Sequence, residues 1–155
     1  MSTFLRALEA EIKRQNANVF SVAEYHEGKV ASLQLSNTNP CQDIYSVAKV
    51  YVVTAVGMLV DRGILSTDEI VTDILAEECP AGYAPIWDRT TVDMLLLHKV
   101  GLPRNFLDID TFDATWFGED YLAYILKEPI VGVAAGADIE PCYTDAAYYL
   151  LACIV

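Results

Sequence analysis

The stretch from Ser46 to Gly63 limits most strongly what this chain can fold into. Ser46 and Lys49 come first, an almost unbroken apolar run then extends to Val60, and Gly63 follows shortly after. The stretch is long enough for about five helical turns, and glycine is common just past the last turn of a helix. Because the run is apolar on nearly every side, it predicts a helix buried between layers rather than one lying on a surface.

Ser46 and Lys49 lie three residues apart, so a helix would place them on one face, where hydroxyl and amine can meet. A serine at the positive end of a helix, beside an amine that can accept its proton, is an arrangement that activates a nucleophile. The alternative is structural: Ser46 caps the helix, and Lys49 extends its amine to water. The four-residue pattern alone leaves both interpretations open.

The composition narrows the class of protein. A chain of 155 residues with 54% hydrophobic residues fits one domain with an ample core. The net charge of −12 disfavours nucleic acids and anionic membrane surfaces as partners. Residues 1–15 carry charges throughout, unlike a signal peptide, and the apolar run of residues 50–60 is too short to cross a bilayer. We therefore expect a cytoplasmic protein without a nucleic-acid or membrane partner.

The four cysteines are widely spaced along the chain, at Cys41, Cys79, Cys142 and Cys153. No C-x-x-C pair or Cys/His cluster suggests a metal site, so we expect neither a metal nor another cofactor. In a cytosolic protein, four cysteines are more often free thiols than two disulfides.

The first elements are expected to be a helix and a hairpin. Residues 3–15 have an apolar stripe at helical spacing. Residues 19–25 and 29–35 alternate like two strands, and the turn His26-Glu27-Gly28 joins them into a β-hairpin with His26 in the turn.

The remainder of the chain is expected to be mostly helical. Ser66 and Glu69 have the spacing of a capping box, which predicts a short helix through Leu75. Thr90 or Thr91 would cap another helix. Further segments are predicted as loops at residues 77–88, 104–117 and 130–140, and as helices at residues 92–98, 118–126 and 144–155.

Three separated segments follow one known pattern. They read YSVAK with LVDRGILSTD at residues 45–49 and 59–68, TVDMLLLHKVGLP at residues 91–103, and YTDAAYYLL at residues 143–151. In order and approximate spacing, these segments resemble the penicillin-recognising serine hydrolases, in particular class C β-lactamases, D-alanyl-D-alanine carboxypeptidases and related esterases. The resemblance implies an α+β fold, the α/β sandwich of β-lactamases and transpeptidases.

The resemblance also implies roles for individual residues. Ser46 would attack a carbonyl and form an acyl-enzyme, and Lys49 would accept its proton or tune the neighbouring base. Tyr143 would be the second base or acid, which for a phenol at neutral pH requires an adjacent positive charge. His98, although it invites a Ser–His interpretation, stands at a position that is structural in this family.

Asp145 stands where the family most often has asparagine. An asparagine can donate a hydrogen bond to a substrate amide carbonyl, whereas an ionised aspartate cannot. The difference disfavours β-lactams and peptides and favours an ester or an altered substrate. The alternative is that Asp145 only complements the positive end of the last helix.

A third family motif, K-T-G or H-x-G on a sheet strand, does not follow Asp145. That strand would supply half of an oxyanion hole. We therefore expect residues 1–155 to form a single β-lactamase-like domain that is truncated at its C-terminal end, with an open sheet edge through which the chain could dimerise.

The expected function is that of a serine hydrolase acting on a small-molecule ester, amide or β-lactam. Two alternatives stay open. One is a catalytically incompetent fragment or relic that acts as a binding module, and the other is a penicillin-binding sensor that is acylated but turns over slowly.

Overall fold

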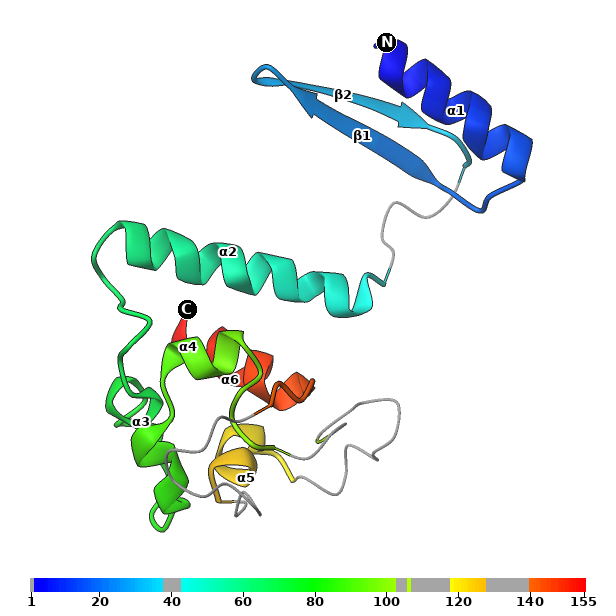
Figure 1. Ribbon diagram of the computed structural model, residues 1–155. Helices are drawn as coiled ribbons and strands as arrows, with labels where there is room; N and C mark the ends of the chain where they lie inside the picture. The colour runs from blue at the N-terminus through cyan, green and yellow to red at the C-terminus, as the bar shows by residue number, and fades with distance from the viewer. Residues whose placement is uncertain (1, 38–42, 103–105, 107–117, 128–139) are drawn as a thin grey trace. The chain divides into compact units, whose positions relative to one another are not determined.

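A computed structural model describes residues 2–37, 43–102, 106, 118–127 and 140–155 (Figure 1). The chain divides into two compact units, Met1–Asp43 and Ile44–Val155. The first holds one helix and an antiparallel sheet, and the described elements of the second are helices. The predicted α+β class is confirmed, and the single truncated domain stays a prediction.

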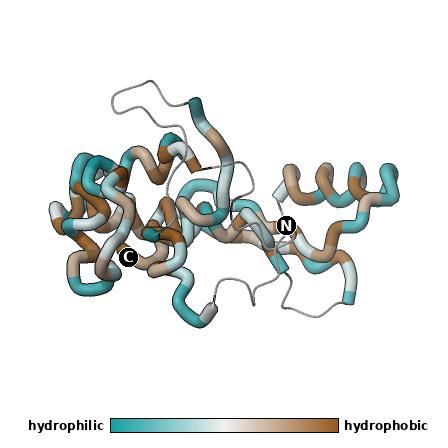
Figure 2. Tube along the Cα trace, turned by 90° about the horizontal axis from the view of Figure 1, so that it is seen from below, coloured by the Kyte–Doolittle hydropathy of each residue, from teal (hydrophilic) through white to brown (hydrophobic). Residues whose placement is uncertain are grey.

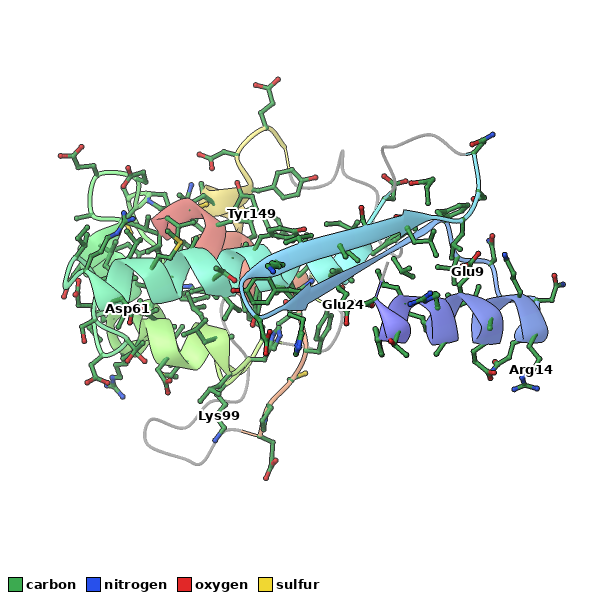
Figure 3. The ribbon with its side chains drawn as sticks, turned by 90° about the horizontal axis from the view of Figure 1, so that it is seen from above. Glu9, Arg14, Glu24, Asp61, Lys99 and Tyr149 are labelled. Atoms are coloured by element: carbon green, nitrogen blue, oxygen red, sulfur yellow. The ribbon has the colours of Figure 1, made fainter. Side chains whose placement is uncertain are left out.

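The first unit begins with the amphipathic helix α1, Thr3–Gln15, as predicted. Ser2 caps it, because its Oγ accepts a hydrogen bond of 3.0 Å from the Leu5 N–H. Figure 2 shows hydrophobic and hydrophilic residues alternating along this helix. Leu5 is buried, while ion pairs join Glu9 to Lys13 and Glu11 to Arg14 on the outside (Figure 3). Helical periodicity therefore accounts for α1.

The hairpin consists of β1, Ser21–His26, and β2, Lys29–Gln34, which pair antiparallel. The turn contains only Glu27 and Gly28, both with positive φ (48° and 75°), as two-residue hairpin turns require. His26 pairs with Lys29 and so belongs to the strand. Its predicted place in the turn is wrong, because a two-residue turn leaves His26 in register with the partner strand.

The second unit begins with a short 3-10 turn, η1, Tyr45–Val47, which leads into the helix α2, Ala48–Asp61. The helix ends as predicted at Gly63, which has a φ of 67°. The Gly63 N–H donates to the Val60 carbonyl at 2.9 Å, and the Ile64 N–H donates to the Leu59 carbonyl at 3.0 Å. These two bonds form a Schellman motif, in which glycine adopts the left-handed conformation without a steric cost.

The sequence predicts that α2 is buried between layers, and within the second unit one side of the helix is covered. Val56 is 2% exposed, but Val50 and Tyr51 on another face are 62% and 69% exposed. The helix contacts α6, Asp145–Ile154, on one side, so the stripe that faces the core is covered. An apolar composition on all sides indicates that a helix can be buried but does not show that other elements surround it.

The middle of this unit contains α3, Val71–Ile74, η2, Pro85–Arg89, and α4, Val92–Leu96. The Ser66 N–H donates to Glu69 Oε1 at 2.7 Å, but the pair closes a turn before α3 and does not cap the helix as predicted. The reason is that Ile70 stays extended and bridges to Thr91. The predicted loop of residues 77–88 overlaps η2, whose first residue is a proline, which is favoured there by its fixed φ.

Thr91 is the N-cap of α4, since its Oγ1 accepts a hydrogen bond of 3.3 Å from the Met94 N–H. The helix ends at Leu96, earlier than predicted, and His98 has a φ of 54°. A left-handed residue cannot continue a right-handed helix, so the chain turns at His98.

The last helices are α5, Tyr121–Lys127, and α6, and α6 lies beside α4 (Figure 1). The predicted helix of residues 144–155 is confirmed as α6, and Thr144 is its N-cap, which accepts a hydrogen bond of 3.0 Å from the Ala146 N–H. The predicted loops at residues 104–117 and 130–140 lie outside the described residues, except for Phe106 and Glu140. Buried side chains from several elements form the core: Val56, Leu65, Val71, Leu75, Trp87, Val92, Leu95, Val100, Leu102, Ile125, Leu126, Ala146, Ala147, Leu150 and Leu151.

Cys79, Cys142 and Cys153 are free thiols, as expected, whereas Cys41 lies outside the described residues. In the part of the chain that the structure describes, no helix has both the length and the apolar character needed to cross a membrane.

Candidate active site

Ser46 lies on the η1 turn directly before α2. The preceding residue, Tyr45, has a φ of 45°, a left-handed conformation that costs an ordinary side chain energy. Ser46 does not cap the helix, because its Oγ contacts other side chains instead of a backbone N–H of the first turn. This turn therefore presents an exposed hydroxyl at the positive end of α2.

Lys49 lies in the first turn of α2 and faces Ser46. Its Nζ is 3.2 Å from Ser46 Oγ and donates a hydrogen bond to it. The two residues thus share a face, as their spacing predicts. The Lys49 side chain is only 18% exposed, so its amine does not extend freely into water.

Tyr143 reaches the same place from the loop before α6. Its Oη is 2.5 Å from Ser46 Oγ, and 97 residues of sequence separate the two. Lys49 Nζ lies 4.9 Å from the centroid of the Tyr143 ring, within the range of a cation–π contact. The serine hydroxyl therefore contacts both a phenol and an amine.

Asp145 is the first residue of α6 and forms an ion pair with Lys49 through its Oδ1. The structure thus brings all four predicted site residues into one cluster, with Asp145 joined to Ser46 through Lys49. The carboxylate also lies at the positive end of α6, where the helix dipole favours a negative charge. Both interpretations of Asp145, as a site residue and as a helix-end acid, agree with this position.

The environment of Lys49 favours its protonated form. Burial has the largest single effect on the pKa of Lys49 and lowers it, but hydrogen bonds and charges from Asp145 and Tyr143 together raise the pKa above its ordinary value. Lys49 is therefore an ammonium at neutral pH, a donor rather than a base.

His98 supports the loop that carries Tyr143. Its ring centroid lies 4.8 Å from that of Tyr143 and 4.9 Å from that of Tyr148. Its Nδ1 accepts a hydrogen bond of 3.4 Å from the Thr144 N–H, and its carbonyl accepts one of 3.0 Å from the Cys142 N–H. The structure thus shows ring and backbone contacts for His98 and no contact with Ser46 among the described residues.

The pKa of His98 is lowered chiefly by burial and further by the positive charge of Lys49, against a smaller opposing effect of Asp145. The imidazole is therefore neutral at pH 7. Since Nδ1 is the acceptor, Nε2 carries the proton.

Tyr148, on α6, also contacts this cluster, although the sequence analysis does not name it as a site residue. Its ring lies 5.8 Å from Lys49 Nζ, and its Oη donates to the Leu96 carbonyl at 3.3 Å. The available signal was the spacing from Asp145, because residues three apart on a helix share a face. Within the described ranges, no three His, Cys, Asp or Glu side chains come close enough to hold a metal ion.

These features define a class of protein. The chain is α+β, a serine and a lysine three residues apart lie at the start of a helix, and a tyrosine from a distant loop contacts the serine hydroxyl. The family model described as Beta-lactamase matches residues 5–155, almost the entire chain. The chain therefore belongs to the β-lactamase family, a family of the serine-hydrolase type, and the resemblance of the three segments is confirmed at the family level. A search of curated proteins found no match.

Proposed function

We propose that the chain is a serine hydrolase that forms an acyl-enzyme on Ser46. One observation carries the proposal: Ser46 Oγ lies 2.5 Å from Tyr143 Oη and 3.2 Å from Lys49 Nζ. A nucleophilic hydroxyl within hydrogen-bond reach of a proton acceptor, which a third group orients, is the arrangement that covalent catalysis requires.

The raised pKa of Lys49 supports the following division of roles between Lys49 and Tyr143. An ammonium cannot accept the Ser46 proton, so Tyr143 Oη is the acceptor in reach, in its phenolate form. Lys49 supplies a positive charge 4.9 Å from the Tyr143 ring centroid, beside the group that would take the proton. Its donated hydrogen bond also orients Ser46 Oγ toward the substrate.

Acylation then proceeds in two proton transfers. Ser46 Oγ bonds to the carbonyl carbon as its proton passes to Tyr143 Oη. When the tetrahedral intermediate collapses, the bond to the leaving group breaks, and Tyr143 returns the proton to that group. In the second half of the reaction, water attacks the acyl carbon as its proton passes to Tyr143 Oη. The bond between that carbon and Ser46 Oγ then breaks, and Tyr143 returns the proton to Ser46 Oγ.

The negative oxygen of the tetrahedral intermediate needs hydrogen-bond donors. The Ser46 N–H lies at the start of η1, and among the described residues no backbone carbonyl accepts it. We propose this N–H as one donor, because it lies close to the positive end of α2.

The proposed substrates are small-molecule esters, amides or β-lactams, and esters are favoured. The reason is Asp145, which cannot donate a hydrogen bond to an amide carbonyl of a substrate.

The experiment is intact-mass spectrometry after incubation with a fluorescent penicillin and, separately, a fluorophosphonate, with Ser46→Ala as the control. We expect one fluorophosphonate adduct that is absent in the variant. Equal labelling of both proteins, or none of either, would contradict the proposal. A penicillin adduct that persists for hours would favour the slowly turning-over sensor.

The alternative function is a binding module without catalysis. The observation that favours it is the Lys49–Asp145 ion pair, which offsets the positive charge that Tyr143 needs. A folded chain that gives no adduct with either probe would support this alternative.

A further inference from the structure

We infer that Asp145 selects acyl donors that carry a protonated amine close to the scissile carbonyl, as in an amino-acid ester. The inference rests on the proposed function and specifies the substrate class of the same site. It assigns Asp145 to substrate recognition, whereas Ser46, Lys49 and Tyr143 carry the chemistry.

Asp145 is placed to contact a substrate held on Ser46. One of its carboxylate oxygens contacts Lys49 Nζ, and Lys49 Nζ is 3.2 Å from Ser46 Oγ. A single ammonium group therefore separates the carboxylate from the nucleophile. A group recognised by Asp145 must accordingly lie near the carbonyl carbon that Ser46 attacks.

The carboxylate keeps capacity for a second partner. Its side chain is 33% exposed, and in the described part of the chain Lys49 is the one residue that donates to it, through Oδ1. An ionised carboxylate has two oxygens and accepts several hydrogen bonds. Among the described residues, no donor contacts Oδ2, and the side chain is exposed in part, so we take Oδ2 as the oxygen that a ligand would contact.

The hydrogen-bonding character of Oδ2 indicates which chemical group of a substrate would bind there. A carboxylate only accepts hydrogen bonds, so a substrate carbonyl or carboxylate would face it as a second acceptor. An ammonium group donates, and the resulting charge-assisted hydrogen bond is stronger than one between neutral groups. A neutral alkyl group would gain neither contact.

The net charge of the chain also favours a cationic substrate. Lys49 repels a second cation, but its charge is paired with Asp145, and the nearby His98 is neutral at pH 7. The chain has 22 acidic and 10 basic side chains, a net charge of −12, and most of this acidic excess lies in residues 44–155. A negative field of this kind raises the local concentration of cationic substrates and lowers that of anionic ones.

Three 4-nitrophenyl esters of similar size test the inference: those of glycine, propanoate and hemimalonate, which place an ammonium, a methyl or a carboxylate beside the carbonyl. The kcat/KM of each is measured for the full chain and for Asp145→Asn, after subtraction of the rate with Ser46→Ala. The ammonium group also activates an ester chemically. The diagnostic quantity is therefore the glycine-to-propanoate ratio of kcat/KM, compared between wild type and variant.

We expect this ratio to fall about tenfold in Asp145→Asn, the effect of losing one charge-assisted contact. Asp145→Glu should restore part of the ratio. The control Asp93→Asn removes the same charge from an exposed position of α4 and should leave the ratio unchanged. An equal ratio in wild type and Asp145→Asn would overturn the inference while the proposed function stands. If no ester, propanoate included, reacts faster than with Ser46→Ala, the proposed function fails and the inference fails with it.

Discussion

Lys49 and Asp145 form an ion pair across 96 residues of sequence, and each lies in the first turn of its helix. The pair therefore holds the N-terminal ends of α2 and α6 together. Ser46 precedes the first of these helices and Tyr143 precedes the second, so the same contact brings the two hydroxyl groups within 2.5 Å. The ion pair thus both positions the site and sets the charge on its lysine.

Replacing Asp145 with asparagine should activate Ser46. Without the carboxylate, the hydrogen bond and charge of Asp145 no longer raise the pKa of Lys49, so this pKa falls while burial still lowers it. More neutral amine near pH 7 provides a second base beside Ser46, and we expect fluorophosphonate labelling about three to ten times faster. The measurement is the labelling rate between pH 6 and 10, with Asp93→Asn as the control. A slower rate at every pH would contradict this prediction and would mean that the loss of positioning outweighs the gain of a second base.

Tyr143→Phe should abolish most acylation without unfolding the chain. The change removes the hydroxyl 2.5 Å from Ser46 Oγ but retains the ring beside His98. General acid–base catalysis contributes about a hundredfold to ten-thousandfold, so the labelling rate should fall by about a hundredfold or more. Thermal unfolding should shift little, because this side chain is partly exposed.

The matched control is Tyr149→Phe on α6, where the side chain is 41% exposed against 42% for Tyr143 (Figure 3). This variant should label at the wild-type rate. If the labelling rate fell equally in both variants, the cause would be packing of the loop and helix rather than proton transfer.

The stability of the chain should decrease as the pH falls below about 6.5, and His98 should contribute to the decrease. The pKa of His98 is lowered from 6.5 in the folded chain, so the unfolded chain binds a proton first. The His98 contribution is therefore fully present above pH 6.5 and is lost as the pH falls toward the lowered pKa. Protonation would also place a hydrogen on Nδ1, which accepts the Thr144 N–H.

The measurement is the free energy of unfolding in urea at several pH values between 8 and 5, for wild type and His98→Asn. Asparagine tolerates a positive φ such as the 54° of His98 and does not titrate. The slope of stability against pH should be smaller in the variant. Identical slopes would mean that protonation of His98 does not oppose folding.

Two glycines of the same region should respond in opposite directions to alanine. Gly63 has a φ of 67° in the turn after α2, so Gly63→Ala should destabilise the chain by about 1 kcal/mol through backbone strain. Gly57 lies within α2, and a Cβ added there meets no atom within 4 Å. Gly57→Ala should stabilise the chain by about 0.5–1 kcal/mol, because alanine favours the helix. Urea unfolding measures both, and effects of the same sign would contradict the assignment of the α2 end.

Local order in this protein could be predicted from the sequence, because it depends on groups a few residues apart. The periodicity of α1, the turn at Gly63 and the capping of α4 by Thr91 are of this kind. The contact between Ser46 and Lys49 also follows from spacing within one turn of a helix. The early end of α4 is also closed by local bonds, from the His98 N–H to the Leu95 carbonyl and from the Lys99 N–H to the Met94 carbonyl, but the left-handed conformation of His98 was not predicted.

Other properties were decided by the tertiary structure. The burial of α2 depends on which elements pack against it, and composition does not show that α6 covers one of its sides. The protonated state of Lys49 depends on a carboxylate 96 residues away, and the helix that carries this carboxylate is placed by packing of the core. Residue types and short spacings determine which groups are available for chemistry. Packing between distant segments determines their distances and charges, because both depend on atoms that come together only when the chain has folded.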